Sequence, residues 1–107
     1  MSLGGPALIW TPIDTAEAAR NLSIAVVGSG LAACANVIGP IQSHYVWEGA
    51  MQSNEEYGVL FKLDARTLDQ AVALVSDLHP YDVPVVIGWL ADAAPPATLS
   101  FLSNGLV

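Results

Sequence analysis

The sequence is poor in charged residues, and positive charge is the scarcest kind. Only 12% of its 107 residues are charged, and ten acidic residues against three basic ones leave a net charge of −7. An ordinary soluble domain carries charge on about one quarter of its residues. Because proteins that hold nucleic acid need clustered lysine and arginine, this balance excludes nucleic acid as the main partner. Apolar residues make up 53%, so we expect part of the surface to contact another protein.

Cysteine and long apolar runs are also scarce. Cys34 is the only cysteine, which excludes an intrachain disulfide and predicts a cytoplasmic protein. Residues 21–47 carry no formal charge, but polar residues and the Gly39-Pro40 pair interrupt them, so no membrane span is expected. The first residues do not resemble a signal peptide. We expect one domain over residues 1–107, with residues 1–6 disordered or derived from cloning.

The first third of the chain predicts a strand followed by a helix. An apolar run over residues 7–11 ends at Pro12 and is typical of a short strand. Asp14 and Glu17 have the spacing of a capping box, which predicts a helix that begins at Asp14. The glycines of residues 28–30 end this helix. Its apolar face comprises Ala18, Leu22, Ala25 and Val26.

Alternating apolar residues then predict a hairpin. Residues 32–47 are expected to form a long strand that bends at Gly39-Pro40. A polar connection is expected over residues 48–56. Residues 57–63 alternate again and predict a second strand, antiparallel to the first.

The last third predicts a helix, a strand and a short helix. Asp64 can cap a helix whose apolar positions repeat at helical spacing up to Leu78, and Pro80 stops it. Residues 83–91 are almost continuously apolar, as in a central strand buried on both faces. A final short helix is expected within residues 95–104.

The resulting order, β-α-β-β-α-β, predicts an α+β fold of the ferredoxin-like type. In this sandwich two helices cover one face of an antiparallel sheet, and here a short C-terminal helix is added. Helices on one face leave the other uncovered, although the predicted strands carry many aromatic and aliphatic residues. An exposed apolar sheet face or edge usually marks an assembly surface, so we predict a homo-oligomer.

Between the second helix and the last strand lies a short connector with two prolines. Pro80 and Pro84 fix the backbone torsion φ and remove two hydrogen-bond donors, so residues 78–84 form neither helix nor central strand. The connector holds His79, Tyr81 and Asp82. These side chains either pack a corner or form a site.

Four motifs together resemble the family of the divalent-cation tolerance protein CutA, over about residues 7 to 102. They are Leu31-Ala32-Ala33-Cys34-Ala35-Asn36, Tyr45-Val46-Trp47-Glu48-Gly49, Phe61-Lys62, and Leu78-His79-Pro80-Tyr81-Asp82-Val83-Pro84. The resemblance implies a ferredoxin-like protomer that forms a tight trimer through its sheets. It also implies a distant structural likeness to PII signalling proteins and a link to tolerance of copper or other metals. Within these motifs Cys34, Asn36, Pro80 and Pro84 are interpreted as structural positions.

Two departures from the family pattern concern the proposed copper ligands. The family usually carries glutamate after the last proline, where this chain has Val85, and some members have cysteine where this chain has Trp10. The resemblance therefore leaves His79 as a ligand for Cu²⁺ or another divalent cation, held weakly, because a single imidazole does not bind a metal tightly. The alternative is that His79 packs the end of the second helix.

Lys62 and three aromatic residues are further candidates for an inter-subunit cleft. Lys62 lies in an apolar strand, so it either forms a salt bridge, with Glu48 or Asp82 for example, or binds an anion in the cleft. The aromatic residues either pack a trimer or stack on a planar ligand. They are Tyr45, Trp47 and Tyr81.

The sequence contains no nucleophile triad, phosphate-binding loop or metal-hydrolase motif, so we do not expect an enzyme. Two functions stay open. The first is a CutA-like homotrimer in divalent metal tolerance, acting by weak metal binding or as an adaptor for other proteins. The second is a PII-like sensor that binds a small anionic metabolite in clefts between subunits.

Overall fold

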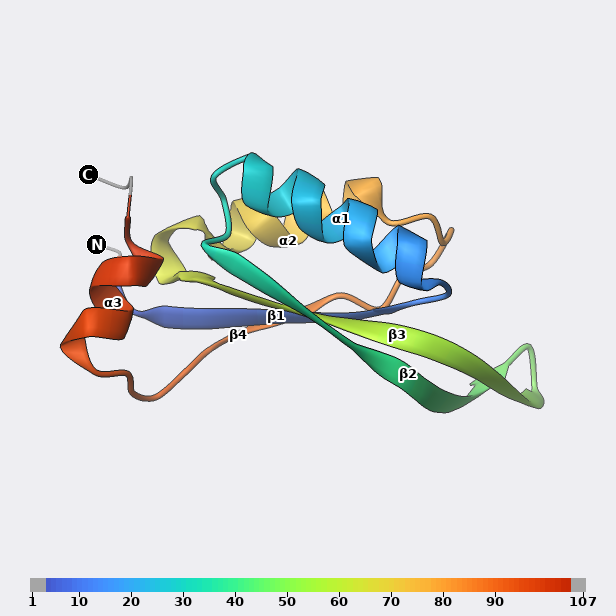
Figure 1. Cartoon of the computed structure of the whole chain (residues 1–107). Helices are drawn as coiled ribbons and strands as arrows, with labels where there is room; N and C mark the ends of the chain where they lie inside the picture. Colours follow the sequence, from blue (N-terminus) through green and yellow to red (C-terminus); the bar gives the residue numbers. More distant parts are fainter. Residues whose placement is uncertain (1–3, 105–107) are drawn as a thin grey trace.

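One antiparallel sheet carries two helices on the same face, as the computed structural model of the chain shows for residues 4–104 (Figure 1). The elements are β1 (Pro6–Ile13), α1 (Ala16–Gly28), β2 (Cys34–Trp47), β3 (Ala50–Asp64), a 3₁₀ turn (Ala65–Thr67), α2 (Leu68–Leu78), β4 (Ile87–Leu90) and α3 (Pro96–Leu102). The strand order is β2-β3-β1-β4. This arrangement confirms the predicted α+β ferredoxin-like fold and the short C-terminal helix.

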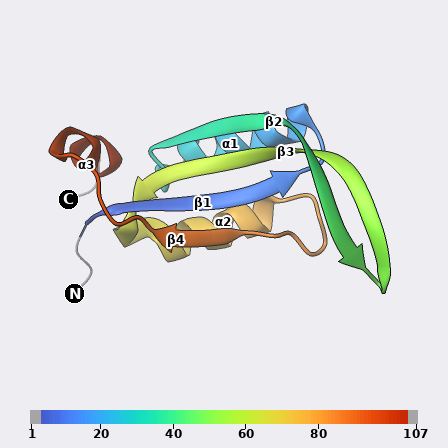
Figure 2. The ribbon, with the colours of Figure 1, turned by 90° about the horizontal axis from the view of Figure 1, so that it is seen from below.

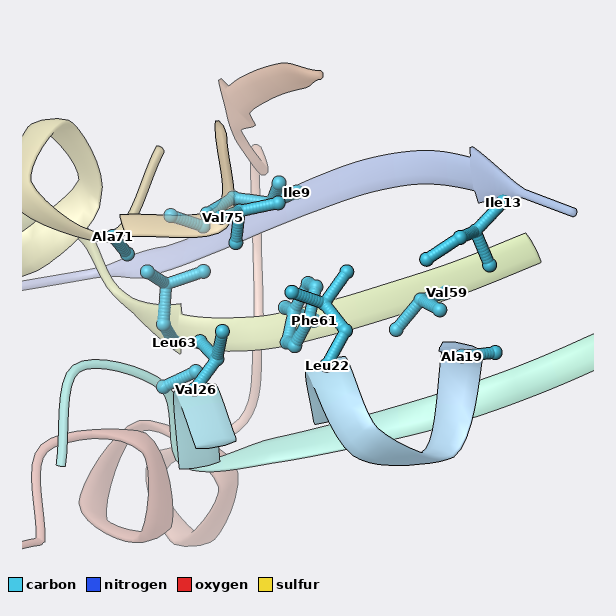
Figure 3. Packing of buried hydrophobic residues seen from close by; sticks show 12 residues of the cluster. Ile9, Ile13, Ala19, Leu22, Val26, Val59, Phe61, Leu63, Ala71 and Val75 are labelled. Atoms are coloured by element: carbon cyan, nitrogen blue, oxygen red, sulfur yellow. The ribbon is translucent and has the colours of Figure 1, made fainter. Parts of the chain in front are cut away.

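The core lies between the sheet and the two helices. Alternate residues of β1 and β3 point to this side, because side chains alternate across a strand. Phe61 of β3 is fully buried and lies beside Leu22 of α1 (Figure 3). The cluster comprises Ala7, Ile9, Ile13, Ala19, Leu22, Val26, Ala32, Val59, Phe61, Leu63, Ala71 and Val75.

The cap of α1 differs from the prediction. Thr15, not Asp14, is the N-cap: its backbone is extended and its hydroxyl accepts a hydrogen bond from the Ala18 N–H at 3.0 Å. Asp14 stands one residue too early to reach that donor. The predicted Asp14–Glu17 capping box is therefore wrong, whereas the predicted end of the helix at residues 28–30 is confirmed.

The β2–β3 hairpin is longer than predicted. Its turn consists of Glu48 and Gly49 alone, with φ of 51° and 80°, the signs that a type I′ turn requires. The predicted connection over 48–56 is wrong, because residues from Ala50 onward already pair with β2. Polar side chains do not prevent a strand where a partner strand supplies the hydrogen bonds. The bend expected at Gly39-Pro40 is confirmed by a register shift there.

Asp64 caps the second helical segment through a 3₁₀ turn. One of its carboxylate oxygens accepts hydrogen bonds from the backbone N–H of Arg66 at 2.8 Å and from its Nε at 3.0 Å. The hydrogen bonds from Arg66 lower the pKa of Asp64 below its ordinary value. The helix α2 follows and ends at Leu78, before Pro80, as predicted.

The last strand is an edge strand. A central strand over 83–91 was expected, but β4 is only Ile87–Leu90 and pairs with β1 alone, so this prediction is wrong. Although the strand is apolar, it is not buried on both faces within the protomer, because Leu90 keeps 64% of its surface exposed. The apolar run therefore lies on the surface of the protomer.

The face of the sheet opposite the helices is open in the protomer (Figure 2). Trp10 of β1 and Trp89 of β4 lie on this face, as the strand register requires. The Trp10 ring covers Gly58 of β3: a Cβ atom at position 58 would lie 2.0 Å from it. At one end of the sheet the β2–β3 hairpin extends beyond both helices (Figure 1).

Two sequence predictions concern the ends of the chain and membrane insertion. Residues 1–3, expected to be disordered or derived from cloning, lie outside the described residues, whereas Pro6 already belongs to β1. Within residues 4–104, no helix has the length and apolar character needed to cross a membrane.

Candidate ligand-binding hollow

A hollow of about 720 Å³ lies where β1 ends, between the β2–β3 hairpin and the connector that follows α2. Each of these segments supplies part of the wall because β1 ends at the same end of the sheet at which the hairpin extends and the connector begins (Figure 2). Its lining residues are Pro12, Asp14, Tyr45, Val46, Trp47, Asn54, Glu56, Tyr81, Asp82, Val83 and Val85.

The polar wall of the hollow is acidic. Asp14, Glu56 and Asp82 border it, and no lysine, arginine or histidine does. Glu56 is buried, with 6% of its surface exposed, whereas the two aspartates are exposed at the rim. Burying a carboxylate costs free energy unless a hydrogen-bond donor satisfies it, so the burial of Glu56 requires a donor nearby.

Tyr81 supplies the only hydrogen bond to the side chain of Glu56 among residues 4–104. Its hydroxyl donates to Oε2 of Glu56 at 2.6 Å. Burial and this bond to a carboxylate raise the pKa of Tyr81 well above its ordinary value of 10.0, so the phenol stays protonated as a donor. The other oxygen, Oε1, has no partner in this range, and no fully enclosed side-chain oxygen there lacks one. Oε1 is therefore not fully enclosed by the protein.

His79 lies behind the hollow and is held by the backbone. Its Nε2 is 2.9 Å from the carbonyl oxygen of Pro12, and its Nδ1 is 3.2 Å from the backbone nitrogen of Tyr81. A carbonyl can only accept and an N–H can only donate, so Nε2 carries the proton and Nδ1 accepts. The ring also makes an edge contact with Tyr81, at 4.6 Å between centroids. His79 thus joins the connector to the end of β1.

These contacts bear on copper ligation. Both ring nitrogens of His79 are already engaged, so ligation would require one of the two hydrogen bonds to break. Val85 borders the hollow at the position of the family's proposed carboxylate, and Trp10 covers Gly58 instead of offering a thiolate. Within residues 4–104 no group of three or more His, Cys, Asp or Glu side chains is placed to hold a metal ion. The protomer's residues do not fit a copper site.

The other predicted residues divide between the hollow and the sheet. Tyr45, Trp47 and Tyr81 all border the hollow of the protomer, and their predicted place in a cleft between subunits stays a prediction. Lys62 does not line it: it pairs with Cys34 across β2 and β3, on the face opposite the helices. Neither Glu48 nor Asp82 forms the expected salt bridge with Lys62 within the protomer, since the ion pair found in residues 4–104 joins Arg66 to Asp64.

The structural motif positions lie apart from the hollow or at its edge. Asn36 pairs with Leu60 in the sheet, next to the pair of Cys34 and Lys62. Pro80 and Pro84 belong to the connector that forms one wall.

Sequence reasoning missed Glu56 and Asp14 as site residues. Glu56 was placed in a solvated connection, and Asp14 was interpreted as a helix cap. The Glu48-Gly49 pair was the available signal, because a glycine at the second position of a two-residue turn indicates a tight hairpin. With that turn in place, residues up to Glu56 become strand, and Glu56 is carried back toward the end of β1.

The fold and the hollow define a class: a small ferredoxin-like protein with an open sheet face and an acidic, aromatic-lined recess. Comparison with known proteins identifies the family within this class. The family model described as "CutA1 divalent ion tolerance protein" matches residues 7–105. This chain belongs to that family, which confirms the resemblance found in its sequence motifs.

Relatives and solved structures agree with this membership. "Protein CutA, chloroplastic" of Arabidopsis thaliana is 32% identical over 91% of this chain and 53% of its own length. "Divalent-cation tolerance protein CutA" of Thermus thermophilus is 32% identical over 75% and 78% of the two chains. The crystal structure of divalent ion tolerance protein CutA1 from Ehrlichia chaffeensis has a TM-score of 0.90, with 28% identity and 96% of both chains covered. The chain spans about half the length of the first plant relatives that it matches.

Proposed function

We propose that the chain is a homotrimeric CutA protein that acts in tolerance of divalent metal ions such as copper. The observation that carries this proposal is the family match over residues 7–105. It is supported by the name of the Thermus thermophilus relative, which refers to divalent-cation tolerance. The family is named for tolerance and not for a catalysed reaction, in keeping with a protein that is not an enzyme. We further propose the cytoplasm as its compartment.

Assembly is supported by the apolar surface of the protomer. Large apolar residues are exposed on the edge strand β4, on the connector and at the tip of the hairpin; among them are Tyr45, Val46, Trp47, Met51, Val83, Val85, Ile87, Trp89 and Leu90. Surfaces of this kind are usually covered in the functional state. A trimer of identical chains would cover them by closed symmetry.

Two modes of action are consistent with metal tolerance. In the first, the assembled protein binds a divalent cation weakly; in the second, it acts as an adaptor for other proteins. Because both nitrogens of His79 are engaged and no ligand group is assembled in residues 4–104, the adaptor mode is the better supported one.

Calorimetric titration of the full chain with Cu²⁺ distinguishes these modes. Direct binding predicts weak uptake that His79→Ala reduces and that His44→Ala, which removes an exposed imidazole of β2, leaves unchanged. The adaptor mode predicts no uptake, or uptake that is lost only with His44→Ala and so reflects an incidental surface ligand. A stoichiometric, tight site that depends on His79 would contradict the adaptor mode.

The alternative function, a PII-like sensor for an anionic metabolite, finds no favouring observation in the protomer. The hollow is bordered by three carboxylates, and Lys62 lies elsewhere on the sheet. Thermal-shift screening with nucleotides and carboxylates tests it: a stabilising anion whose effect is lost in Lys62→Ala would revive this hypothesis.

A further inference from the structure

We propose that an ion pair joins neighbouring chains of the trimer, with Lys62 of one protomer bound to Glu56 of the next. The inference rests on the proposed homotrimer and names the polar contact that fixes its arrangement. Three observations support it. Each of the two residues lacks a full partner in the protomer, both lie on the open face of the sheet, and their positions along β3 suit a head-to-tail ring.

Lys62 is a cation without a partner on an apolar sheet face. The chain has three lysine and arginine residues. Arg66 is already in an ion pair, and Arg20 lies on α1, on the other side of the sheet. Lys62 pairs with Leu8 of β1 and Cys34 of β2, and no ion pair involves it within residues 4–104. A neighbouring chain that covers this face removes water from the ammonium group, which then needs an anion.

Glu56 is the buried carboxylate that still has an oxygen without a partner. Two carboxylates are buried among residues 4–104, Glu56 and Asp64. Arg66 donates hydrogen bonds to both oxygens of Asp64. Tyr81 donates only to Oε2 of Glu56, and Oε1 is not fully enclosed by the protein. A chain that covers this end of the sheet would bury Oε1, so it has to supply a donor.

Glu56 and Lys62 project from the same face of β3. The strand pairs with β1 without a register shift, and Gly58, which stands between the two, lies under the Trp10 ring on the open face. Side chains an even number of positions apart share one face of a strand. Six positions along the strand separate Glu56 from Lys62 by about 20 Å, so they cannot reach each other within one protomer.

This separation suits a ring of three chains. In a closed three-fold ring every contact is head-to-tail, so a patch on one chain meets a different patch on the next. Lys62 and Glu56 are two such patches, of opposite charge, on one surface. Each chain presents the cation to one neighbour and the carboxylate to the other, and each of the three interfaces holds one pair. Complementary charges of this kind fix the register of an apolar interface.

Charge reversal followed by light scattering tests the pair. Lys62→Glu brings two carboxylates together, and Glu56→Lys brings two ammonium groups together, so each should shift the protein toward monomers at micromolar concentration. The variant with both reversals restores opposite charges and should again be trimeric. Arg20→Glu makes the same change of charge on an exposed position of α1 and should leave the trimer intact.

The outcomes separate the pair from the assembly. A wild-type chain that is monomeric would contradict the homotrimer and the pair with it. A trimeric wild type whose Lys62→Glu variant stays trimeric to the same dilution would refute the pair alone. Dissociation of both single variants without recovery in the double variant would also refute it.

A milder variant keeps the test valid if circular dichroism shows that Glu56→Lys does not fold. Glu56→Gln keeps an acceptor for the Tyr81 hydroxyl but removes the negative charge. Added to Lys62→Glu, it should relieve the repulsion and lower the concentration at which the trimer dissociates by about tenfold. An unchanged dissociation concentration would show that Lys62 meets a different carboxylate.

Cross-linking identifies the partner of Lys62 directly, because Lys62 is the only lysine of the chain. A carbodiimide joins an amine to a carboxylate that it contacts through an amide bond. Mass spectrometry of the treated wild-type trimer should find Lys62 joined to Glu56 of another chain. Lys62→Arg keeps the charge but offers no such amine and should not give this product. A link from Lys62 to Glu48 or Asp82 instead would overturn the proposal.

Discussion

At the scale of single residues, the open sheet face is shaped by one glycine beneath one tryptophan. A methyl group at position 58 would collide with the Trp10 ring, with 2.0 Å between the new Cβ and the nearest ring atom. Gly58→Ala should therefore lower the free energy of unfolding by about 1–3 kcal/mol. Chemical denaturation at a fixed protein concentration measures this loss.

The control is the same substitution without the tryptophan. In a Trp10→Ala background the collision disappears, so Gly58→Ala should then cost less than about 0.5 kcal/mol. An equal cost in both backgrounds would show that the glycine is needed for another reason than close contact with Trp10.

Tyr81 makes a pH-dependent contribution to stability. Its pKa is raised in the folded state, so the folded protein keeps the phenolic proton more firmly than the unfolded chain does. Tyr81 therefore stabilises the fold below its ordinary pKa of 10.0, and this stabilisation is lost as the pH rises beyond that value. Tyr81→Phe leaves Glu56 without its donor and should cost about 1 kcal/mol at neutral pH.

Urea denaturation of wild type and Tyr81→Phe at neutral pH and at about pH 10.5 checks this contribution. The difference between the two proteins should shrink at the higher pH, because only the wild type loses stability through Tyr81. A difference that stays constant would mean that neither burial nor Glu56 raises the pKa of Tyr81 in the folded protein.

Residue-level features were only partly predictable. The three aromatic residues of the hollow were recognised from their chemistry, and the structure brings them together. Glu56 was not recognised, because its importance comes from burial by a segment 25 positions further along the chain, which carries Tyr81. The Glu48-Gly49 turn could have placed Glu56 in a strand, but its contact with Tyr81 leaves no local signal in the sequence.

At the scale of elements, the start of α1 depends on a single hydroxyl. Thr15 accepts the hydrogen bond from Ala18, so Thr15→Ala should lower the free energy of unfolding by about 1 kcal/mol. Asp14→Ala removes only a negative charge near the N-terminus of α1, and the loss of its interaction with the helix dipole should cost about 0.3 kcal/mol. Thermal denaturation of both variants measures the contrast. If Asp14→Ala cost more than Thr15→Ala, the assigned cap would be wrong.

Element order was predictable, whereas element length and position were less so. Hydrophobic periodicity located both core helices and the paired strands, because it records which face meets the core. It failed at β3, where polar residues form strand because β2 supplies partners, and at β4. There a continuous apolar run indicated burial, but the burial within one protomer is incomplete, as the exposed Leu90 shows.

At the scale of the whole molecule, the protomer exposes large apolar residues along β4. Exposed apolar residues of β4 should be covered by a neighbouring chain, so placing a charge there should weaken assembly. We expect Leu90→Lys to shift the protein toward monomers at micromolar concentration. Gln70→Lys, which adds the same charge at an exposed position of α2, should not. Sedimentation velocity compares the two, and equal behaviour would place the interface away from β4.

Light scattering coupled to size-exclusion chromatography measures whether this CutA-family chain is a homotrimer in solution. We predict a molar mass three times that of the 11.2 kDa chain, unchanged on dilution through the micromolar range. A mass equal to that of one chain at every concentration would contradict it.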